Sequence, residues 1–435
     1  MKLSVIGCGY LGAVHATAMA SLGHEVVGID VDEERISLLS DGKAPFFEPG
    51  LDDLLTQARD LGALTFSTDI SLAQGAAVHF VAVGTPQRPD GDGADLRFVD
   101  SAIAALLPIL GLGDLVVGKS TVPVGTAGRL AEQIRSTGAR LVWNPEFLRE
   151  GFAIEDTLRP DRLVYGVTQN GSAERDVSIL DEIYRPAIDA GTPRVVTDYA
   201  TAELVKVSAN AFLATKISFI NAMAEIAEVT GADVTQLADA IGFDARIGRR
   251  FLNAGIGFGG GCLPKDIRAF SARAEELGVG QSVRFLREVD AINLRRRQRV
   301  AELIADAFDG EPQDRHVAVL GLAFKPDSDD TRDSPALDVA QRLHDAGAVV
   351  HAYDPAAIDT ARRIAPDLHF AESVDNAVRE AEVVVVATEW REFREMLPES
   401  ISQVTRSRTI IDARNCLDPQ AWRAAGWDYR GMGRP

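Results

Sequence analysis

The start of the chain carries a glycine pattern that few folds use. A short apolar strand is predicted over residues 3–6, and Gly7-Cys8-Gly9-Tyr10-Leu11-Gly12 follows at once, ahead of a helical pattern. A second strand, Glu25–Ile29, ends at Asp30. Glycines at these positions let the backbone approach a pyrophosphate, whose charge meets the helix N-terminus. The pattern predicts a Rossmann-like domain that binds a dinucleotide. Asp30 favours NAD over NADP because a carboxylate bonds a ribose diol and repels a 2′-phosphate. The alternative is a tightly packed strand, turn and helix without a ligand.

Three more predicted strands end in polar turns. Residues 79–83 lead into Gly84-Thr85-Pro86, residues 115–119 lead into a turn with Thr121, and residues 141–143 lead into a loop with Glu146 and Glu150. Doubly wound sheets bind ligands at the carboxyl ends of their parallel strands. We therefore expect these turns at one ligand-binding edge, although turn residues and solvated acids of the same kind also occur without a function.

The last third of the chain repeats the opening order of strand, turn, helix, strand and acid. His316–Leu320 is a predicted strand, residues 334–346 a helix, and Val349–Tyr353 a strand that ends at Asp354. Residues 383–388 and Thr409–Asp412 complete a second sheet pattern. Its turn reads Gly321-Leu-Ala-Phe-Lys325 in place of the three spaced glycines. This half is therefore expected to bind a nucleotide differently, with Lys325 and Arg414 as phosphate partners.

The middle of the chain is predicted to be helical. Tyr199–Thr230 contains neither proline nor glycine and reads as one long helix, on which Lys206 and Asn210 share a face at a spacing of four. The alternative for Lys206 is a surface lysine beside a polar contact. Helical patterns continue over residues 237–241, 242–254 and 269–308, and a polar interval at residues 309–315 marks the next boundary.

These patterns predict an α/β protein with two Rossmann-like, doubly wound parallel-sheet domains joined by a long central helix and a helical middle region. The expected domains are an NAD-binding domain over residues 1–198, a central helical domain over residues 199–308, and a second Rossmann-like domain over residues 309–435. The long helix is largely apolar and must be covered, which favours a second subunit.

Charge and cysteine usage exclude several classes of protein. Sixty-four acidic against 45 basic residues give a net charge of −19, which disfavours a nucleic-acid or anionic-membrane surface. Cys8, Cys262 and Cys416 lie far apart, without the spacing of a disulfide framework or a zinc site, so no metal is expected. No signal peptide is recognisable, and the apolar runs are short for a membrane span, so a cytoplasmic location is expected.

The stretch from Gly255 to Asp266 reads Gly-Ile-Gly-Phe-Gly-Gly-Gly-Cys-Leu-Pro-Lys-Asp. Pro264 suits the first turn of a helix, so Cys262 is predicted to precede a helix N-terminus, where the helix dipole favours a thiolate. Lys265 adds a nearby cation, and Asp266 adds a carboxylate that could hold a proton. The alternative is a glycine-rich turn around a buried cysteine.

Taken together, these motifs resemble the UDP-glucose/GDP-mannose dehydrogenase family of nucleotide-sugar 6-dehydrogenases over essentially the whole chain. The most specific match is the stretch that ends Gly-Phe-Gly-Gly-Gly-Cys262-Leu-Pro-Lys-Asp266. Supporting matches are residues 7–12, 120–126 and 144–151, Lys206 with Asn210, residues 251–255, and Ala323-Phe-Lys325-Pro. Two positions depart from the family pattern. Many relatives have Val where this chain has Leu11, and others have Ser or Tyr where it has Gly261.

The resemblance implies an activity. Members oxidise a sugar C6 alcohol to a carboxylate with two NAD per sugar and release no aldehyde, and UDP-glucose is the substrate expected for this chain. By resemblance, Cys262 is the nucleophile that forms a thiohemiacetal and then a thioester. Lys206 and Asn210 would stabilise the oxyanion. Asp266, Glu150 and Thr121 would position water and move protons, with the general base left open among them.

The resemblance also implies binding residues. For NAD these are Gly7, Gly9, Tyr10, Leu11, Gly12, Asp30, Arg35, Thr85, Thr121, Glu150, Lys265 and Arg332. For the UDP-sugar they are Glu146, Phe147, Leu148, Arg149, Glu150, Lys206, Asn210, Arg246, Phe251, Leu252, Asn253, Ala254, Gly255, Gly259, Lys325 and Arg414. Arg246 matches a family arginine that reaches the substrate of a neighbouring subunit, so a homodimer through the central helix is expected.

Three alternatives stay open at this point. The sugar nucleotide could carry an N-acetylhexosamine or be GDP-mannose, because the pocket at the sugar C2 is not readable from sequence. A single-step hydroxyacid dehydrogenase of similar layout would not need Cys262. A non-catalytic nucleotide-sugar sensor would bind without turnover, although the complete set of Cys262, Lys206, Asn210 and Asp266 disfavours it.

Overall fold

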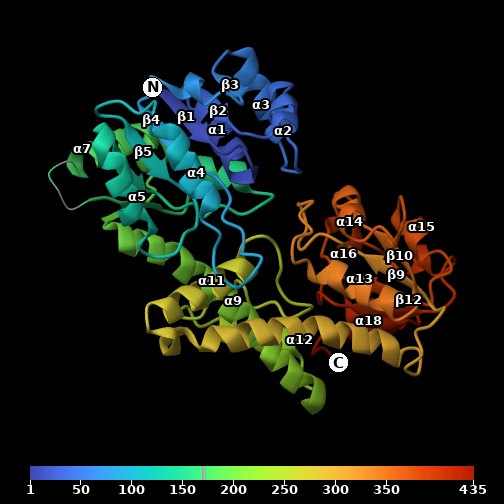
Figure 1. Cartoon of the computed structure of the whole chain (residues 1–435). Coiled ribbons are helices and arrows are strands. Elements are labelled where there is room, and N and C mark those ends of the chain that lie inside the picture. The colour runs from blue at the N-terminus through green and yellow to red at the C-terminus, as the bar shows by residue number, and fades with distance from the viewer. Residues whose placement is uncertain (169–170, 172) are drawn as a thin grey trace. The chain divides into compact units, whose positions relative to one another are not determined.

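The computed structural model describes residues 1–168, 171 and 173–435, and the chain divides into two compact units (Figure 1). The first unit comprises Met1–Ala209 and Ala272–Gly278, and the second comprises Asn210–Ser271 and Val279–Pro435. Each unit is built around one sheet. Helices α9 (Tyr199–Thr230) and α11 (Leu263–Glu276) each begin in one unit and end in the other.

The first unit contains an eight-stranded sheet in the order β3-β2-β1-β4-β5-β6-β7-β8. Neighbouring strands are parallel except β6 and β7, which pair antiparallel. The strands are β1 Lys2–Ile6, β2 Glu25–Ile29, β3 Leu64–Ser67, β4 Val78–Val81, β5 Leu115–Gly118, β6 Arg140–Trp143, β7 Leu163–Gly166 and β8 Arg194–Thr197.

Both faces of this sheet are covered by helices. Leu3 and Val5 of β1 pack with α1 on one face, while Ile6 joins Ile103 of α4 and Leu130 of α5 on the other. The buried strands therefore read as continuous apolar runs, as a parallel sheet requires. The helices are α1 Tyr10–Ser21, α2 Glu33–Ser40, α3 Leu51–Asp60, α4 Arg97–Leu106, α5 Thr126–Ile134, α6 Ala153–Leu158, α7 Ala173–Ile183 and α8 Arg185–Asp189.

The second unit contains a six-stranded parallel sheet in the order β11-β10-β9-β12-β13-β14. Counted from its own first strand, this is the same 3-2-1-4-5-6 order as the first six strands of the other sheet, so the two doubly wound domains predicted from sequence are confirmed. The strands are β9 His316–Leu320, β10 Val349–Tyr353, β11 His369–Phe370, β12 Val383–Val386, β13 Thr409–Asp412 and β14 Asp428–Gly431.

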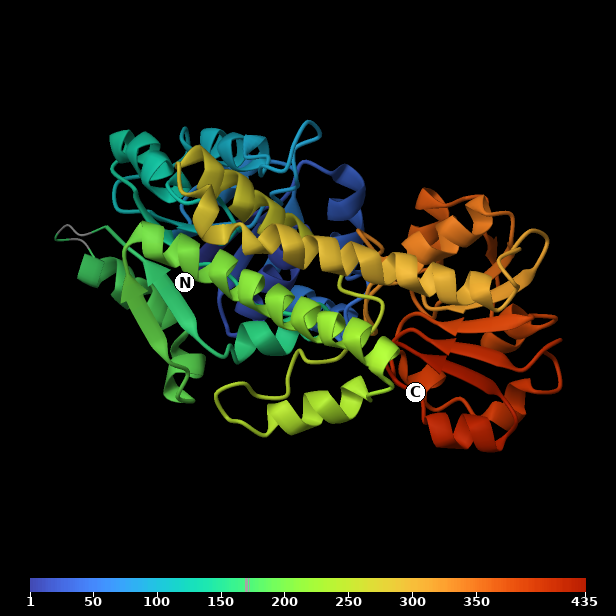
Figure 2. The same ribbon diagram turned by 90° about the horizontal axis from the view of Figure 1, so that it is seen from below.

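Two of the remaining helices, α9 and α12 (Phe285–Asp306), are long, and Figure 2 shows both as uninterrupted ribbons. Helix α9 has 32 residues, which confirms the predicted central helix. The others are α10 Val234–Gly242, α13 Pro335–Asp345, α14 Ile358–Ile364, α15 Val374–Val378, α16 Arg391–Arg394, α17 Pro398–Ile401 and α18 Pro419–Ala424. Among the described residues, none of the helices is both long and apolar enough to cross a membrane.

Two helical predictions were wrong. Residues 242–254 are not a helix: α10 ends at Gly242, and Gly248 and Phe251 then take φ values of 69° and 66°. Residues 269–308 are not one helix either, since α11 ends at Glu276 and Gly278 has a φ of 75° before α12 begins. A positive φ lies outside the right-handed helical region, so no right-handed helix can run through these positions whatever the apolar pattern around them.

Candidate active site

Residues 7–12, the dinucleotide turn, join β1 to the first turn of α1 in the first unit. Gly7 has a φ of 90°, and a Cβ there would lie 2.6 Å from Cγ1 of Val83. A Cβ at Gly12 would lie 1.7 Å from the Gly7 oxygen. These two glycines are therefore required by packing. Gly9 has open space around the Cβ position, and as the N-cap of α1 it offers no side-chain hydrogen bond to the first N–H groups of that helix. The turn leaves room for a pyrophosphate at this point.

Asp30 lies beside the dinucleotide turn at the end of β2. Its carboxylate is 8% exposed and accepts hydrogen bonds from the Cys8 N–H at 2.7 Å and the Asp32 N–H at 3.0 Å. The Arg35 guanidinium donates to the same carboxylate at 3.0 Å. The structure thus brings together the turn, the acid and Arg35, which were all predicted to contact NAD. The donor set and the opening at Gly9 fit that cofactor.

The turns after β4 and β5 are bonded to each other. The Thr85 hydroxyl donates to the Thr121 carbonyl at 2.7 Å, and the Ser120 hydroxyl donates to the Val83 carbonyl at 2.7 Å. Because β4 and β5 are adjacent parallel strands, both threonines lie at the carboxyl edge of the sheet, where the sequence placed them.

Residues 144–151, the glutamate loop, follow β6 at the same edge of the sheet. Glu146 is ion-paired with Lys206 of α9 at 2.9 Å, and both side chains are largely buried. The loop backbone is also held by Glu146, whose second oxygen accepts from the Leu148 N–H at 2.7 Å. A buried pair of this kind fixes the amine in position because separation would leave an unpaired buried charge.

Lys119, at the end of β5, is a buried cation that the sequence analysis did not single out. Its ammonium donates to the side-chain oxygen of Asn144 at 3.1 Å and to the Tyr184 hydroxyl at 3.2 Å. The pKa of Lys119 is lowered to about 8, mainly by burial, which Glu146 partly opposes and to which the charge of Lys206 adds. The signal in the sequence was a lysine inside an apolar strand end, where a cation is uncommon without a partner.

Residues 255–262, the cysteine loop, lie in the second unit and pack closely against other residues of that unit. Gly257 has a φ of 104°, and a Cβ there would lie 2.4 Å from the Asn293 side-chain oxygen. Gly260 has a φ of 84°, and a Cβ there would lie 2.8 Å from the Phe324 ring. The described structure therefore accounts for these two glycines by backbone conformation and by contact with α12 and the Phe324 turn, before any ligand is considered.

Cys262 is exposed and directly precedes α11, as predicted. Asp266, one helical turn further on, is 3% exposed and accepts from the Asn210 amide at 2.6 Å and the Lys265 ammonium at 2.5 Å. Three of the predicted residues thus form one cluster. Burial raises the pKa of the thiols of Cys8 and Cys416, which makes those two cysteines poor nucleophiles and leaves Cys262 as the accessible thiol.

Arg414, after β13, ties the cysteine loop to the second sheet. Its guanidinium donates to the carbonyls of Gly257, Phe324 and Ala387, each at 2.9 Å, and is ion-paired with Glu389 at 3.3 Å. Lys325 directly follows Phe324 in the turn after β9, and its ammonium lies 5.3 Å from the centre of the Phe324 ring. Both predicted phosphate partners are therefore at the carboxyl edge of the second sheet.

Asp354 is the counterpart of Asp30 in the second sheet, but it is engaged differently. It is 1% exposed and accepts from the N–H groups of Leu322 at 2.7 Å and Ala323 at 3.0 Å, and from the Trp390 indole at 3.1 Å. A carboxylate with these donors and no exposure cannot bond a ribose. This half of the molecule is not a second dinucleotide site of the same design.

The other predicted residues have separate surroundings. Arg246 is highly exposed and paired with Asp244 at 2.6 Å, and Arg332 is paired with Asp330 at 2.7 Å. Arg149 is paired with Asp156 at 2.6 Å, and the Phe147 ring lies 3.8 Å below the Arg162 guanidinium. Leu11 and Leu148 are partly buried on the first core, Leu252 and Ala254 are buried, Phe251 and Asn253 are exposed, and buried Gly259 lies against Asp333.

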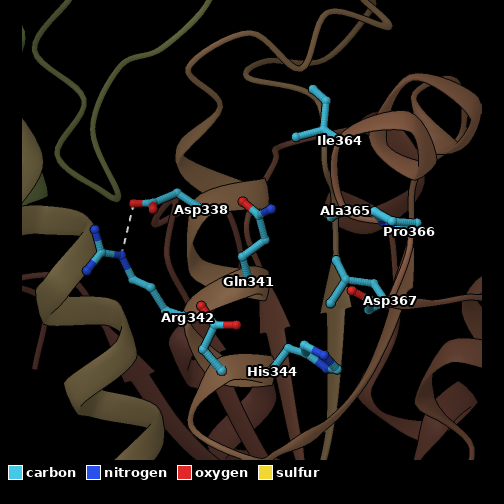
Figure 3. Close-up of a pocket in the computed structure, with 10 residues that line it drawn as sticks. Asp338, Gln341, Arg342, His344, Ile364, Ala365, Pro366 and Asp367 are labelled. Carbon is cyan, nitrogen blue, oxygen red and sulfur yellow. Dashed lines mark hydrogen bonds and ion pairs between the residues drawn. The ribbon is translucent and has the colours of Figure 1, made fainter.

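A surface hollow of about 430 Å³ in the second unit is not part of these clusters (Figure 3). It lies between the last turns of α13 and the segment that leads into β11, so it is at the amino edge of the sheet, opposite to Arg414. Asp338, Asp345 and Asp367 line it, and these carboxylates would repel a phosphate. In the described part of the chain, no group of three His, Cys, Asp or Glu residues is arranged to hold a metal.

Comparisons with known proteins agree with this arrangement. Three models of the UDP-glucose/GDP-mannose dehydrogenase family match: the NAD binding domain at residues 1–188, the central domain at residues 200–295 and the UDP binding domain at residues 318–419. A UDP-glucose 6-dehydrogenase from Rhizobium meliloti is 42% identical and covers all of both chains.

Two solved structures extend the comparison. A UDP-glucose dehydrogenase from Pyrobaculum islandicum has a TM-score of 0.90 at 37% identity, over 100% of this chain and 98% of that one. A UDP-D-ManNAc dehydrogenase from Pyrococcus horikoshii has a TM-score of 0.85 at 29% identity, over 100% of this chain and 99% of that one. With full-length matches and all three domain models in order, this chain belongs to the UDP-glucose/GDP-mannose dehydrogenase family.

Proposed function

We propose that this chain is an NAD-dependent UDP-glucose 6-dehydrogenase, which oxidises the C6 alcohol of UDP-glucose to the carboxylate of UDP-glucuronate. The observation that carries the proposal is an exposed Cys262 just before α11, with a cluster of buried Asp266, buried Asn210 and partly buried Lys265 within one helical turn. Two relatives support the choice of substrate: the UDP-glucose 6-dehydrogenase from Rhizobium meliloti, at 42% identity, and the UDP-glucose dehydrogenase from Pyrobaculum islandicum, at 37%.

The proposed chemistry has three steps on the sugar C6. Loss of a proton from the hydroxyl and of a hydride from C6 gives an aldehyde. The Cys262 thiolate then adds to that carbon and forms a C–S bond, and loss of a second hydride gives a thioester. Water attacks the thioester, the C–S bond breaks, the thiolate leaves and the carboxylate is formed. Bound NAD supplies the hydride acceptor for each oxidation.

We assign roles to the residues of this chain as follows. Lys206 and Asn210 donate hydrogen bonds to the oxyanion at C6, a charge that is greater in the transition state than in the substrate. Asp266, Glu150 and Thr121 position the hydrolytic water, and one of the two carboxylates, Asp266 or Glu150, accepts its proton. Lys325 and Arg414 contact the UDP phosphates. A cysteine nucleophile works in its reduced form, which fits a cytoplasmic location.

We propose a homodimer through α9. In the second unit, Phe212, Phe219 and Ile226 are 68%, 47% and 54% exposed and recur every seven residues along the helix. A repeat of seven places large apolar side chains in one stripe, which a second helix would cover. In the dimer, Arg246 would reach the substrate of the neighbouring subunit. Sedimentation of a Phe219→Glu variant tests this, and an unchanged dimer would contradict it.

The substrate is tested by initial rates of NADH formation with UDP-glucose, UDP-N-acetylglucosamine, UDP-N-acetylmannosamine and GDP-mannose at equal concentrations. The proposal predicts the highest kcat/KM with UDP-glucose. A higher value with UDP-N-acetylmannosamine would instead group this chain by activity with the UDP-D-ManNAc dehydrogenase from Pyrococcus horikoshii. Binding of a sugar nucleotide without any NADH formation would support a sensor.

A further inference from the structure

A buried carboxylate, Glu48, lies between the dinucleotide turn and the end of the glutamate loop in the first unit. It is 7% exposed. One carboxylate oxygen accepts from the Tyr10 hydroxyl and from the Gly151 N–H at 2.7 Å. The other accepts from the Ala153 N–H at 2.7 Å. A buried carboxylate with three donors holds its partners firmly, because losing any one of them exposes an unpaired buried group.

Two of the three partners of Glu48, Tyr10 and Gly151, belong to different parts of the site. Tyr10 is the first residue of α1 and follows Gly9 directly, and its ring packs 4.7 Å from that of Phe46. Gly151 follows Glu150 directly and has a φ of 78°. The Gly151 N–H also lies 3.1 Å from the Tyr10 hydroxyl. Burial, and then the hydrogen bond to Glu48, raises the pKa of Tyr10, so the hydroxyl stays a neutral donor.

The opposite end of the glutamate loop is fixed independently. Asn144 is 2% exposed, donates to the Val164 carbonyl at 3.0 Å, and accepts from Lys119 at 3.1 Å and from the Tyr184 hydroxyl at 2.8 Å. The middle of the loop is fixed by the ion pair between Glu146 and Lys206. Glu48 therefore fixes the end of the loop that carries Glu150. It also bonds Tyr10, so it connects that end of the loop to the dinucleotide turn.

We propose that Glu48 is a positioning residue that couples cofactor binding to the conformation of the glutamate loop. A ligand that orders the dinucleotide turn would hold Tyr10, and through Glu48 would hold the backbone beside Glu150. By linkage, a sugar nucleotide that orders the loop would tighten cofactor binding by the same factor. The inference rests on the proposed role of the glutamate loop in binding and proton transfer.

The test compares Glu48→Gln, Tyr10→Phe and the control Glu25→Gln. Glutamine keeps the size of the side chain but turns an amide NH₂ toward a donor in either orientation. Glu25 is exposed at the start of β2, at the other end of that strand from Asp30. NADH fluorescence titrations with and without saturating UDP-glucose give the coupling factor for each protein. Initial rates give kcat and KM, and thermal unfolding midpoints report the fold.

We expect UDP-glucose to tighten NADH binding at least about fivefold in the parent protein and the Glu25→Gln variant. In Glu48→Gln and Tyr10→Phe this factor falls to below about twofold. The kcat of Glu48→Gln falls by about tenfold to a hundredfold, as expected when a reacting group is displaced. A coupling factor in Glu48→Gln equal to that of the parent would overturn the inference, as would a factor near one in the parent.

A Glu150→Gln variant separates the failure of this inference from failure of the proposed function. Full kcat in Glu150→Gln would refute the proposed role of the loop. A large loss of kcat in Glu150→Gln, together with Glu48→Gln behaving like Glu25→Gln, would leave that role intact and refute the coupling through Glu48.

Discussion

Replacing Asn293 with alanine should loosen the cysteine loop. Asn293 lies in α12, is fully buried, and grips the peptide groups of Phe258: its side-chain oxygen accepts from the Phe258 N–H at 2.7 Å, and its amide donates to the Phe258 carbonyl at 2.9 Å. Phe258 is four residues before Cys262. The backbone of the loop is thus held by a side chain of α12, and 35 positions of the sequence separate Phe258 from Asn293.

The two halves of this contact should contribute unequally. The Phe258 carbonyl also accepts from Arg297 at 3.3 Å, so it keeps one donor in Asn293→Ala. The Phe258 N–H is left buried without its partner, which costs about 1–3 kcal/mol. Alanine has the better helix propensity and returns about 0.6 kcal/mol. Taking the middle of that range, the net expectation is about 1.4 kcal/mol of local destabilisation.

Hydrogen exchange measures this cost at the loop itself, which suits a chain of two units better than one global unfolding curve. An expected 1.4 kcal/mol corresponds to exchange about tenfold faster at the Phe258 amide and its neighbours. The matched control is Gln298→Ala, at an exposed position of the same helix. Exchange within about threefold of the parent in Asn293→Ala would refute the reasoning, because the Phe258 N–H would then not depend on Asn293.

Three further predictions follow from the two units. Cys262→Ser should stall after the first oxidation or accumulate a stable ester, visible as an increase in protein mass, because an alkoxide leaves less readily than a thiolate; full turnover would argue against the covalent route. Asp30→Ala should weaken NAD binding and reduce discrimination against NADP in initial-rate assays, because the carboxylate would bond the ribose diol; unchanged affinities would contradict that assignment. The depressed pKa of Lys119 means that the folded protein binds fewer protons than the unfolded chain between pH 8 and 10.5, so stability rises with pH there. Relative to Lys119→Met, the parent should gain about 1.5 kcal/mol of unfolding free energy between pH 8 and 9.5 in urea titrations, and parallel pH profiles would count against it.

The strands that could be predicted were those with a buried apolar run or a glycine turn behind them. β1 and β9 are of this kind, and both were found with the helix and acid that follow. β8 was missed because its residues are mostly exposed, and β11 because it has two residues. The strands β3, β7 and β14 were not predicted either, although β7 is buried. The false helix over residues 242–254 had an apolar pattern, but positive φ values at Gly248 and Phe251 decide the backbone there.

Some residues of the candidate site could also be predicted from sequence motifs, and others could not. Cys262 and Asp266 lie in one short motif, so their spacing was readable, and the structure places Asn210 against Asp266 although 56 positions separate them. Glu48 and Asn293 were missed because their function depends on contacts that the fold creates. Glu48 binds Gly151 across 103 positions, and no local pattern marks it beyond a turn before Pro49 and Gly50.

The most direct test of the proposed activity is the amount of NADH formed per UDP-glucose consumed, with UDP-glucose limiting and NAD in excess. The thioester route through Cys262 predicts two NADH and one UDP-glucuronate for each UDP-glucose, with no free aldehyde trapped by added hydroxylamine. One NADH per sugar, with aldehyde as the product, would contradict the account and leave Cys262 without a catalytic role.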